Sequence, residues 1–168
     1  MLDYSRIVKI AEEQGIVIFI HMNDFDYYKN DLFLDIVKTN PNVNFIILHL
    51  GFLQDGFLSV LCRNDNLYLE TSALNLPLFS NILVNFSEKL IDKDFFKKIL
   101  SSDNLSISLE RIILELDNLI GSEKILFGSD EPWSSLEGQI KFFNNLELEH
   151  KKKRNILYNN ARKVLGIK

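Results

Sequence analysis

The sequence predicts an α/β fold in which about four parallel strands are joined by crossover helices. Short apolar segments alternate along the chain with segments of helical periodicity. Three of the four expected strands are continuously apolar, which is typical of strands covered on both faces. The chain has 168 residues, 46% of them hydrophobic and 25% charged, so it can bury a core as a single domain over residues 1–168.

The first half of the chain is expected to contain two helix and strand pairs. Helical spacing of apolar residues runs from Tyr4 to Gln14, and Gly15 is placed to stop this helix before a strand over Ile16–Ile20. The pattern repeats with a helix over Asp31–Lys38, which ends before a proline and leads into a strand over Asn44–Leu48.

The later elements follow the same alternation with one interruption. A helix over Gln54–Arg63 leads to a strand over Leu67–Glu70, and the fourth strand is expected at Ile125–Phe127. The chain between these strands is longer than one crossover needs, so we expect a helical insertion over residues 76–104 before the crossover helix. The remaining helices are predicted over Ser106–Leu119, Ser134–Phe143 and Glu147–Leu165.

Three side chains that can bind a metal follow three of the apolar strands. His21 follows the first strand, His49 the second, and Asp130 lies on the loop after the fourth. Strand ends are where barrel enzymes place their catalytic groups. Each residue also has a structural interpretation, because an isolated histidine is commonly a hydrogen-bonded core residue and Asp130 could cap the helix that begins near Ser134.

Composition excludes several classes of function. The net charge of −4 gives no general attraction to nucleic acid, and no apolar run approaches the length of a membrane span. The N-terminal residues lack the hydrophobic region of a signal peptide, which predicts a cytoplasmic protein. The lone Cys62 excludes an internal disulfide and, because it lies in an apolar stretch, is expected to be a small buried hydrophobe.

Five ordered segments together resemble the amidohydrolase-related family of metal-dependent TIM-barrel hydrolases and decarboxylases. They are Phe19–His21, Ile47–Gly51, Tyr68–Ser72, Ile125–Pro132 and Ile156–Arg162. The resemblance covers nearly the whole chain, yet it corresponds only to the C-terminal half of a (β/α)8 TIM barrel, strands five to eight. A complete barrel takes about 250 residues, or about 200 at the low end, which is more than this chain has.

The resemblance implies a role for each candidate residue. His21 corresponds to the metal ligand of the fifth strand, His49 to the histidine near the reacting water, and Asp130 to the carboxylate of the eighth strand. The implied cofactor is a divalent metal, zinc first and manganese second, which leaves a position for a water whose pKa it lowers. Asp130 could bind the metal or take a proton from that water, and His49 could polarise the substrate or shuttle the proton. Trp133 is a candidate for contact with a small-molecule substrate, with ordinary packing as the alternative.

The chain also departs from the family. It lacks the His-any-His pair that supplies two ligands on the first strand, and Phe52 and Glu131 stand where the family often has a glycine and an aromatic residue. Half a barrel leaves two open strand edges, at Ile16 and at Ile125, which invite pairing with an N-terminal half-barrel polypeptide or with a second copy of the chain. A truncated reading frame without activity is the third possibility.

The expected function is hydrolysis of a C–N or C–O bond of a small organic substrate through a metal-activated water, in a site that is incomplete without an N-terminal half. Two alternatives stay open, nonoxidative decarboxylation of a small carboxylic acid and a noncatalytic remnant or assembly domain.

Overall fold

The structure, a computed structural model, describes residues 4–21, 31–53, 60–72 and 105–167. The predicted insertion over residues 76–104 and the first part of the predicted helix Gln54–Arg63 lie outside the described residues.

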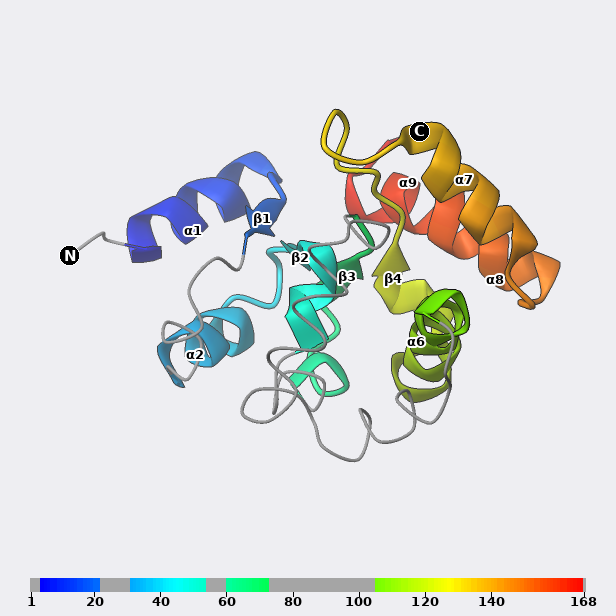
Figure 1. Cartoon of the computed structure of the whole chain (residues 1–168). Coiled ribbons are helices and arrows are strands. Elements are labelled where there is room, and N and C mark those ends of the chain that lie inside the picture. The colour runs from blue at the N-terminus through cyan, green and yellow to red at the C-terminus, as the bar shows by residue number, and fades with distance from the viewer. Residues whose placement is uncertain (1–3, 22–30, 54–59, 73–104, 168) are drawn as a thin grey trace.

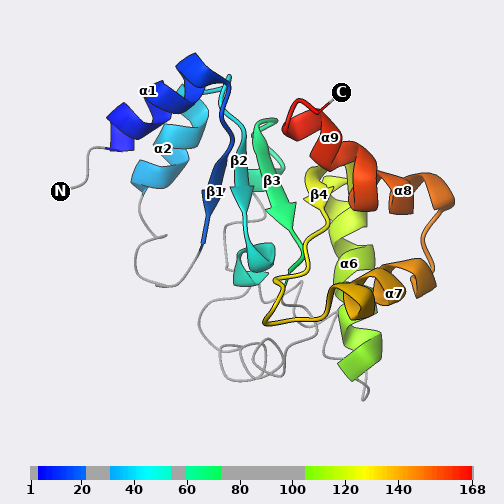
Figure 2. The ribbon, with the colours of Figure 1, turned by 90° about the horizontal axis from the view of Figure 1, so that it is seen from above.

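Four parallel strands form one sheet, as the sequence predicts. They are β1 (Ile18–Ile20), β2 (Phe45–Ile47), β3 (Leu67–Glu70) and β4 (Ile125–Leu126), and they lie in chain order across the sheet. Figure 2 shows them side by side, all with their carboxyl ends toward the same edge. Parallel strands in sequential order with helical connections form a (β/α) barrel segment, and four of them make half of an eight-stranded barrel.

Most predicted helices are confirmed within a few residues of their expected bounds. The structure contains α1 (Tyr4–Gln14), α2 (Asp31–Thr39), α6 (Leu105–Ile120) and α7 (Leu136–Asn145). Gly15, which follows α1, has a φ of 63°, a left-handed conformation that glycine adopts without steric cost. Short 3₁₀ turns, η1 (His49–Leu53) and η2 (Ser122–Lys124), follow β2 and precede β4.

The predicted helix Glu147–Leu165 is three segments in the structure. They are α8 (His150–Arg154), the π-helical turn η3 (Asn155–Asn159) and α9 (Asn160–Val164). A π-helical turn inside a helix rearranges the local hydrogen bonds and leaves backbone carbonyls free to bond elsewhere.

The two faces of the sheet pack against different helices. Because side chains alternate between faces along a strand, Ile46, Tyr68 and Leu126 point to one face, where Val164 of α9 packs on them. The opposite face carries the larger core and meets α2 and α6 (Figure 1). Its buried members include Phe45, Ile47, Leu67, Leu69, Ile125, Val37, Ile112, Ile113 and Leu116.

The outer edge of β4 is closed by the C-terminal segment, which differs from the open edge expected from the sequence. The N–H of Phe127 donates to the carbonyl of Ile156 at 3.0 Å, and the carbonyl of Ile125 accepts from Asn160 Nδ2 at 2.7 Å. The expectation was wrong at this edge because the π-helical turn presents a backbone carbonyl where a neighbouring strand would otherwise pair.

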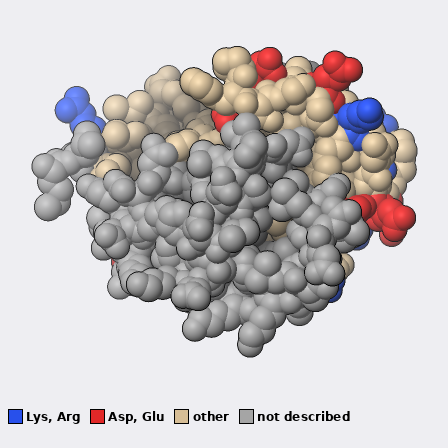
Figure 3. All heavy atoms as spheres, viewed as in Figure 1, with Lys and Arg blue, Asp and Glu red and all other residues tan. Residues whose placement is uncertain are grey.

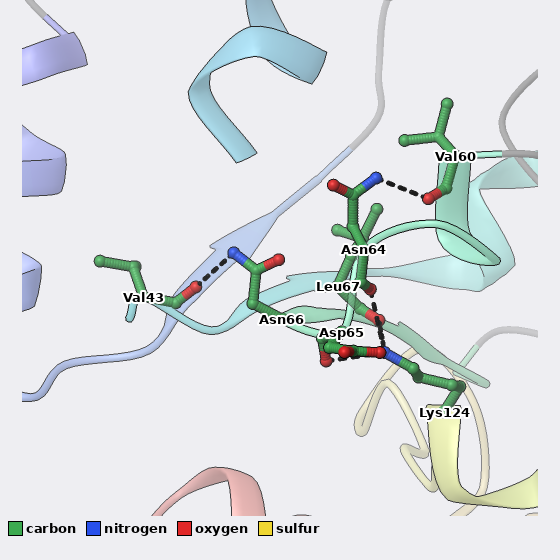
Figure 4. Close-up of polar contacts among 7 residues, drawn as sticks. All are labelled: Val43, Val60, Asn64, Asp65, Asn66, Leu67 and Lys124. Atoms are coloured by element: carbon green, nitrogen blue, oxygen red, sulfur yellow. Dashed lines mark hydrogen bonds and ion pairs between the residues drawn. The ribbon is translucent and has the colours of Figure 1, made fainter. Parts of the chain in front are cut away.

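A hydrogen-bond network joins the loops at the amino ends of the strands (Figure 4). Asn66 Nδ2 lies 3.0–3.1 Å from the carbonyls of Val37, Asn40 and Val43. Lys124 Nζ donates to the carbonyls of Asn64 and Asp65 at 2.9 and 2.6 Å, next to the ring of Tyr68. These contacts hold together the loops from which the strands start.

Cys62 is exposed, whereas the sequence predicted that it would be buried. It lies in the turn that ends the helix before β3, where its thiol is 3.7 Å from the carbonyl of Leu119. On the face drawn in Figure 3, the described surface carries acidic and basic side chains without a large patch of one sign. Within the described ranges, no helix is long and apolar enough to cross a membrane.

Candidate active site at the carboxyl ends of the strands

The structure brings His21 and His49 together. His21 directly follows β1 and is exposed, whereas His49 begins η1 after β2 and is only 6% exposed. Their ring centroids are 4.8 Å apart, with the ring planes at 86°. Adjacent parallel strands end side by side, so two histidines at neighbouring strand ends come into contact although 28 positions separate them in the sequence.

A buried carboxylate and hydroxyl from the end of β3 bond to His49. Ser72 Oγ is 2.8 Å from His49 Nδ1 and donates to Glu70 Oε2 at 2.5 Å. Glu70 also accepts from two backbone amides, the N–H of Ser72 at 2.8 Å and the N–H of His49 at 3.3 Å. Glu70 is therefore a hydrogen-bonded strand end that is also linked to a candidate catalytic residue.

Ser72 is a site residue that the sequence analysis did not single out. Its signal was its position, two residues after Glu70 and directly beyond a strand that neighbours the strand before His49. Ser72 is 4% exposed and belongs to the same buried set as Thr71 and Glu70.

Gly128 is required by the placement of Glu70. A Cβ added to Gly128 would lie 1.3 Å from Glu70 Oε1 and 2.4 Å from its carboxyl carbon. No side chain fits at this position while Glu70 keeps its hydrogen bonds, so the glycine after β4 allows the buried carboxylate to lie against the backbone.

Asp130 lies in the loop between β4 and α7, and its side chain does not cap α7. The N-cap of this helix is Ser135, whose hydroxyl accepts from the N–H of Gly138, and Glu131 Oε2 accepts from the N–H of Leu136 at 2.9 Å. The backbone carbonyl of Asp130 accepts from the N–H groups of Trp133 and Ser134. The structural interpretation of Asp130 as the helix cap is therefore wrong.

Two of the candidate residues have unusual backbone conformations. In the described ranges, three non-glycine residues have positive φ, namely His49 at 56°, Leu50 at 53° and Asp130 at 63°. The left-handed region costs an L-residue about 1–2 kcal/mol, and such residues are concentrated at functional sites. The loops after β2 and β4 thus hold His49 and Asp130 in conformations that local sequence preference does not favour.

Burial and neighbouring charges act on the two buried titratable groups. Burial lowers the pKa of His49, partly offset by its hydrogen bond to the Ser72 carbonyl and by the negative charge of Asp130, while the nearby His21 lowers it further. Burial raises the pKa of Glu70 and the charge of Asp130 raises it too, against the lowering effect of its hydrogen bonds to Ser72 and His49. Both shifts favour the neutral forms.

The described residues provide the donor types of a metal site but not a complete ligand set. Imidazole and carboxylate groups suit a divalent metal such as zinc or manganese. Among the residues that the structure describes, however, no three His, Cys, Asp or Glu side chains are placed to hold one ion together. His21 and Asp130 therefore remain predictions as ligands, and further ligands would have to come from elsewhere.

Trp133 follows Asp130 in the same turn, where its N–H donates to the Asp130 carbonyl at 2.8 Å. Its side chain is 77% exposed, so Trp133 is not packed in the core, which was the alternative interpretation. Contact with a substrate stays a prediction for this residue.

Comparison with known proteins identifies the family. A family profile described as amidohydrolase matches residues 1–167. The chain belongs to the amidohydrolase family. A search of curated proteins gave no significant match.

Several solved structures have a similar fold over nearly the whole of this chain. An amidohydrolase from Burkholderia multivorans with bound zinc has a TM-score of 0.66 at 12% identity, covering 100% of this chain and 58% of that one. A dihydroxybenzoic acid decarboxylase from Polaromonas sp. JS666, with bound manganese and 2-nitroresorcinol, has a TM-score of 0.61 at 14% identity, with coverages of 99% and 55%. A 2-pyrone-4,6-dicarboxylic acid hydrolase from Pseudomonas putida, so named only provisionally, has a TM-score of 0.62 at 15% identity, with coverages of 99% and 57%.

These similarities support the fold alone. Identities of 12–15% do not indicate a shared substrate or mechanism. The chain spans between 55% and 58% of the length of these three structures, which is the share expected for half of a barrel.

Proposed function

We propose that this chain is the C-terminal half of a metal-dependent amidohydrolase that hydrolyses a C–N or C–O bond of a small organic substrate. The observation that carries the proposal is the convergence at one sheet edge of His21 and His49, in ring contact, with the charge of Asp130 acting on His49. The strained backbone at His49 and Asp130 supports a functional rather than a structural origin for this arrangement.

Each residue has a distinct role in the proposal. His21 and Asp130 bind the metal, and His49 transfers a proton to or from the reacting group, a role that its lowered pKa suits by keeping the ring neutral and able to accept. A bound divalent metal would supply a water of lowered pKa and a positive charge near the reacting atoms. The zinc and manganese of the two neighbours named above support a divalent metal without deciding between them.

An N-terminal half-barrel is the proposed source of the missing ligands. The family resemblance places a His-any-His pair on the first strand, which this chain lacks, and the described residues do not complete a ligand set. A polypeptide carrying that pair, or a second copy of this chain if it can provide equivalent donors, would have to complete the site before turnover.

Decarboxylation is the second candidate activity, favoured by the decarboxylase among the similar structures. A noncatalytic assembly role is the remaining alternative. The catalytic and noncatalytic proposals differ in whether the chain participates in stoichiometric metal binding.

The test is metal analysis of the purified chain, alone and mixed with any polypeptide encoded directly upstream, followed by assays of the mixture. Dihydroxybenzoates test for release of CO₂ and pyrone carboxylates test for ring-opening hydrolysis. Asp130→Asn should abolish metal-dependent turnover, while the exposed Asp65→Asn serves as a matched control and should retain it. Absence of stoichiometric zinc or manganese from both preparations would refute the catalytic proposal.

A further inference from the structure

The contacts of Ser72 limit where the protons of the buried cluster can lie. Ser72 has one hydroxyl proton, and when Glu70 is ionised Ser72 donates this proton to Glu70 Oε2 across 2.5 Å, because an ionised carboxylate can only accept. The Ser72 oxygen then faces His49 Nδ1 at 2.8 Å as an acceptor. The Ser72 carbonyl, which can only accept, lies 3.4 Å from the same nitrogen.

Two acceptors therefore converge on one ring nitrogen. A neutral histidine carries its proton on either Nδ1 or Nε2, and the hydrogen bond made by one nitrogen decides the state of the other. With the Ser72 hydroxyl proton committed to Glu70, the favourable arrangement places a proton on His49 Nδ1 and none on Nε2.

We propose that Ser72 is a positioning residue, bridging Glu70 and His49 so that the neutral imidazole is held as the Nδ1–H tautomer with Nε2 as its proton-accepting nitrogen. The consequence for catalysis rests on the proposed function, in which His49 transfers a proton. In many enzymes a carboxylate bonds directly to the catalytic histidine and fixes its tautomer. Here the Ser72 hydroxyl lies between the carboxylate of Glu70 and the ring of His49.

The surroundings keep this bridge in one arrangement. Glu70 receives the backbone N–H of Ser72 on Oε1 and the backbone N–H of His49 on Oε2, so both carboxylate oxygens already accept before the hydroxyl is counted. Gly128 makes room for this placement, because a Cβ at that position would lie 1.3 Å from Glu70 Oε1. Burial raises the pKa of Glu70, and the hydrogen bonds from the two backbone amides and the Ser72 hydroxyl oppose that shift by favouring the ionised form. The ionised form is the one that requires the hydroxyl to donate.

The opposite arrangement gives a different measurable state. If Glu70 held a proton and donated it to Ser72 Oγ, the hydroxyl would donate to His49 Nδ1 and the ring proton would lie on Nε2. The two arrangements share every heavy-atom position, so they are distinguished only by where the proton is.

Long-range ¹H–¹⁵N correlation spectra of the full chain test the proposal directly. Protonated and unprotonated ring nitrogens have widely separated ¹⁵N shifts, and the chain has only three histidines, so the His49 signals can be assigned by substituting His21 and His150 in turn. At about pH 8, well above the ordinary histidine pKa of about 6.5, wild-type His49 should show a protonated Nδ1 and an unprotonated Nε2.

Variants separate the bridge from its surroundings. Ser72→Ala should lose the preference for the Nδ1–H form, Ser72→Thr should restore it by retaining a hydroxyl, and Ser134→Ala is the matched control because Ser134 is also buried but bonds to Gln139. A protonated Nε2 in wild-type protein, or an unchanged tautomer in a folded Ser72→Ala variant, would overturn the proposal. If Ser72→Ala does not fold, the wild-type spectrum together with Ser72→Thr still decides it.

This measurement uses no metal, substrate or second polypeptide, so it stands or fails separately from the proposed catalytic activity. Once an active preparation exists, Ser72→Ala should lower kcat with little change in KM, and Ser72→Thr should recover most of the loss, because a positioning residue acts on the proton transfer rather than on substrate binding.

Discussion

Replacing Asn160 by alanine should destabilise the chain far more than the same change at the preceding residue, Asn159. Asn160 Nδ2 donates to the carbonyls of Ser122 and Ile125, each at 2.7 Å, and the side chain is almost fully buried. After the substitution, the Ser122 carbonyl would still accept a hydrogen bond from the N–H of Ile125. The carbonyl of Ile125 faces away from β3, so it would lose the hydrogen bond that the structure provides at this edge.

The magnitude follows from these two acceptors. A buried carbonyl left without a partner costs about 1–3 kcal/mol, and a lost hydrogen bond whose acceptor keeps another donor costs about 0.5–1.5 kcal/mol. The expected loss in the free energy of unfolding is therefore about 2–4 kcal/mol, a large part of the roughly 5–15 kcal/mol that a native protein has.

Urea unfolding followed by circular dichroism measures this loss. With a slope of about 2 kcal/mol per molar urea, the midpoint should fall by about 1–2 M. Asn159→Ala is the matched control, because Asn159 is half-buried and its amide makes one bond, to Asn155 Oδ1 at 3.0 Å. A midpoint shift no larger for Asn160→Ala than for Asn159→Ala would show that the C-terminal segment does not hold β4 through this amide.

Two further predictions concern the buried carboxylate. Gly128→Ala should lower the unfolding free energy by about 1–3 kcal/mol, measured as a lower urea midpoint, because Glu70 has to move away from the added Cβ. Gly138→Ala in α7 is the control. A Cβ there has ordinary contacts at 3.5 Å, so this change should be neutral or slightly stabilising. Since the pKa of Glu70 is raised in the folded state, its contribution to stability is present below its ordinary pKa of 4.5 and is lost as pH rises through the raised value. The unfolding free energy of wild-type protein should accordingly fall relative to Glu70→Gln as pH increases from about 4 to 8, and a constant difference across this range would contradict the shift.

Much of the fold was predictable because its elements carry local signals. Apolar strands such as Phe45–Ile47 and the helix over Leu105–Ile120 are encoded by hydrophobic period and by glycine stops, and both appear close to the expected positions. The π-helical turn was not predictable, since the apolar spacing of Glu147–Leu165 fits one continuous helix. What interrupts that helix is a tertiary contact, the bond from the Phe127 N–H to the Ile156 carbonyl.

The site was predictable only in part for a related reason. His21 and His49 could be found because each follows an apolar strand, and parallel strands bring such positions to one edge. The role of Ser72 depends on which acceptor its single proton selects, and this is fixed by the distance between a strand end and the turn after a neighbouring strand. No periodicity or spacing within a single sequence segment encodes that distance.

The closed edge of β4 changes how completion of the barrel has to be understood. Closure requires new strand pairing at both ends of the four-stranded sheet. At β1, Ile18 and Ile20 bond toward β2, so the backbone of Phe19 faces outward, and its side chain is 54% exposed. At β4, an incoming strand would have to replace the bonds from Ile156 and Asn160. It would also have to displace Val164 from the sheet face that carries Ile46, Tyr68 and Leu126. Docking of a second half should therefore begin at β1, and weakening the C-terminal segment by Asn160→Ala should make closure at β4 easier even as it destabilises the isolated chain.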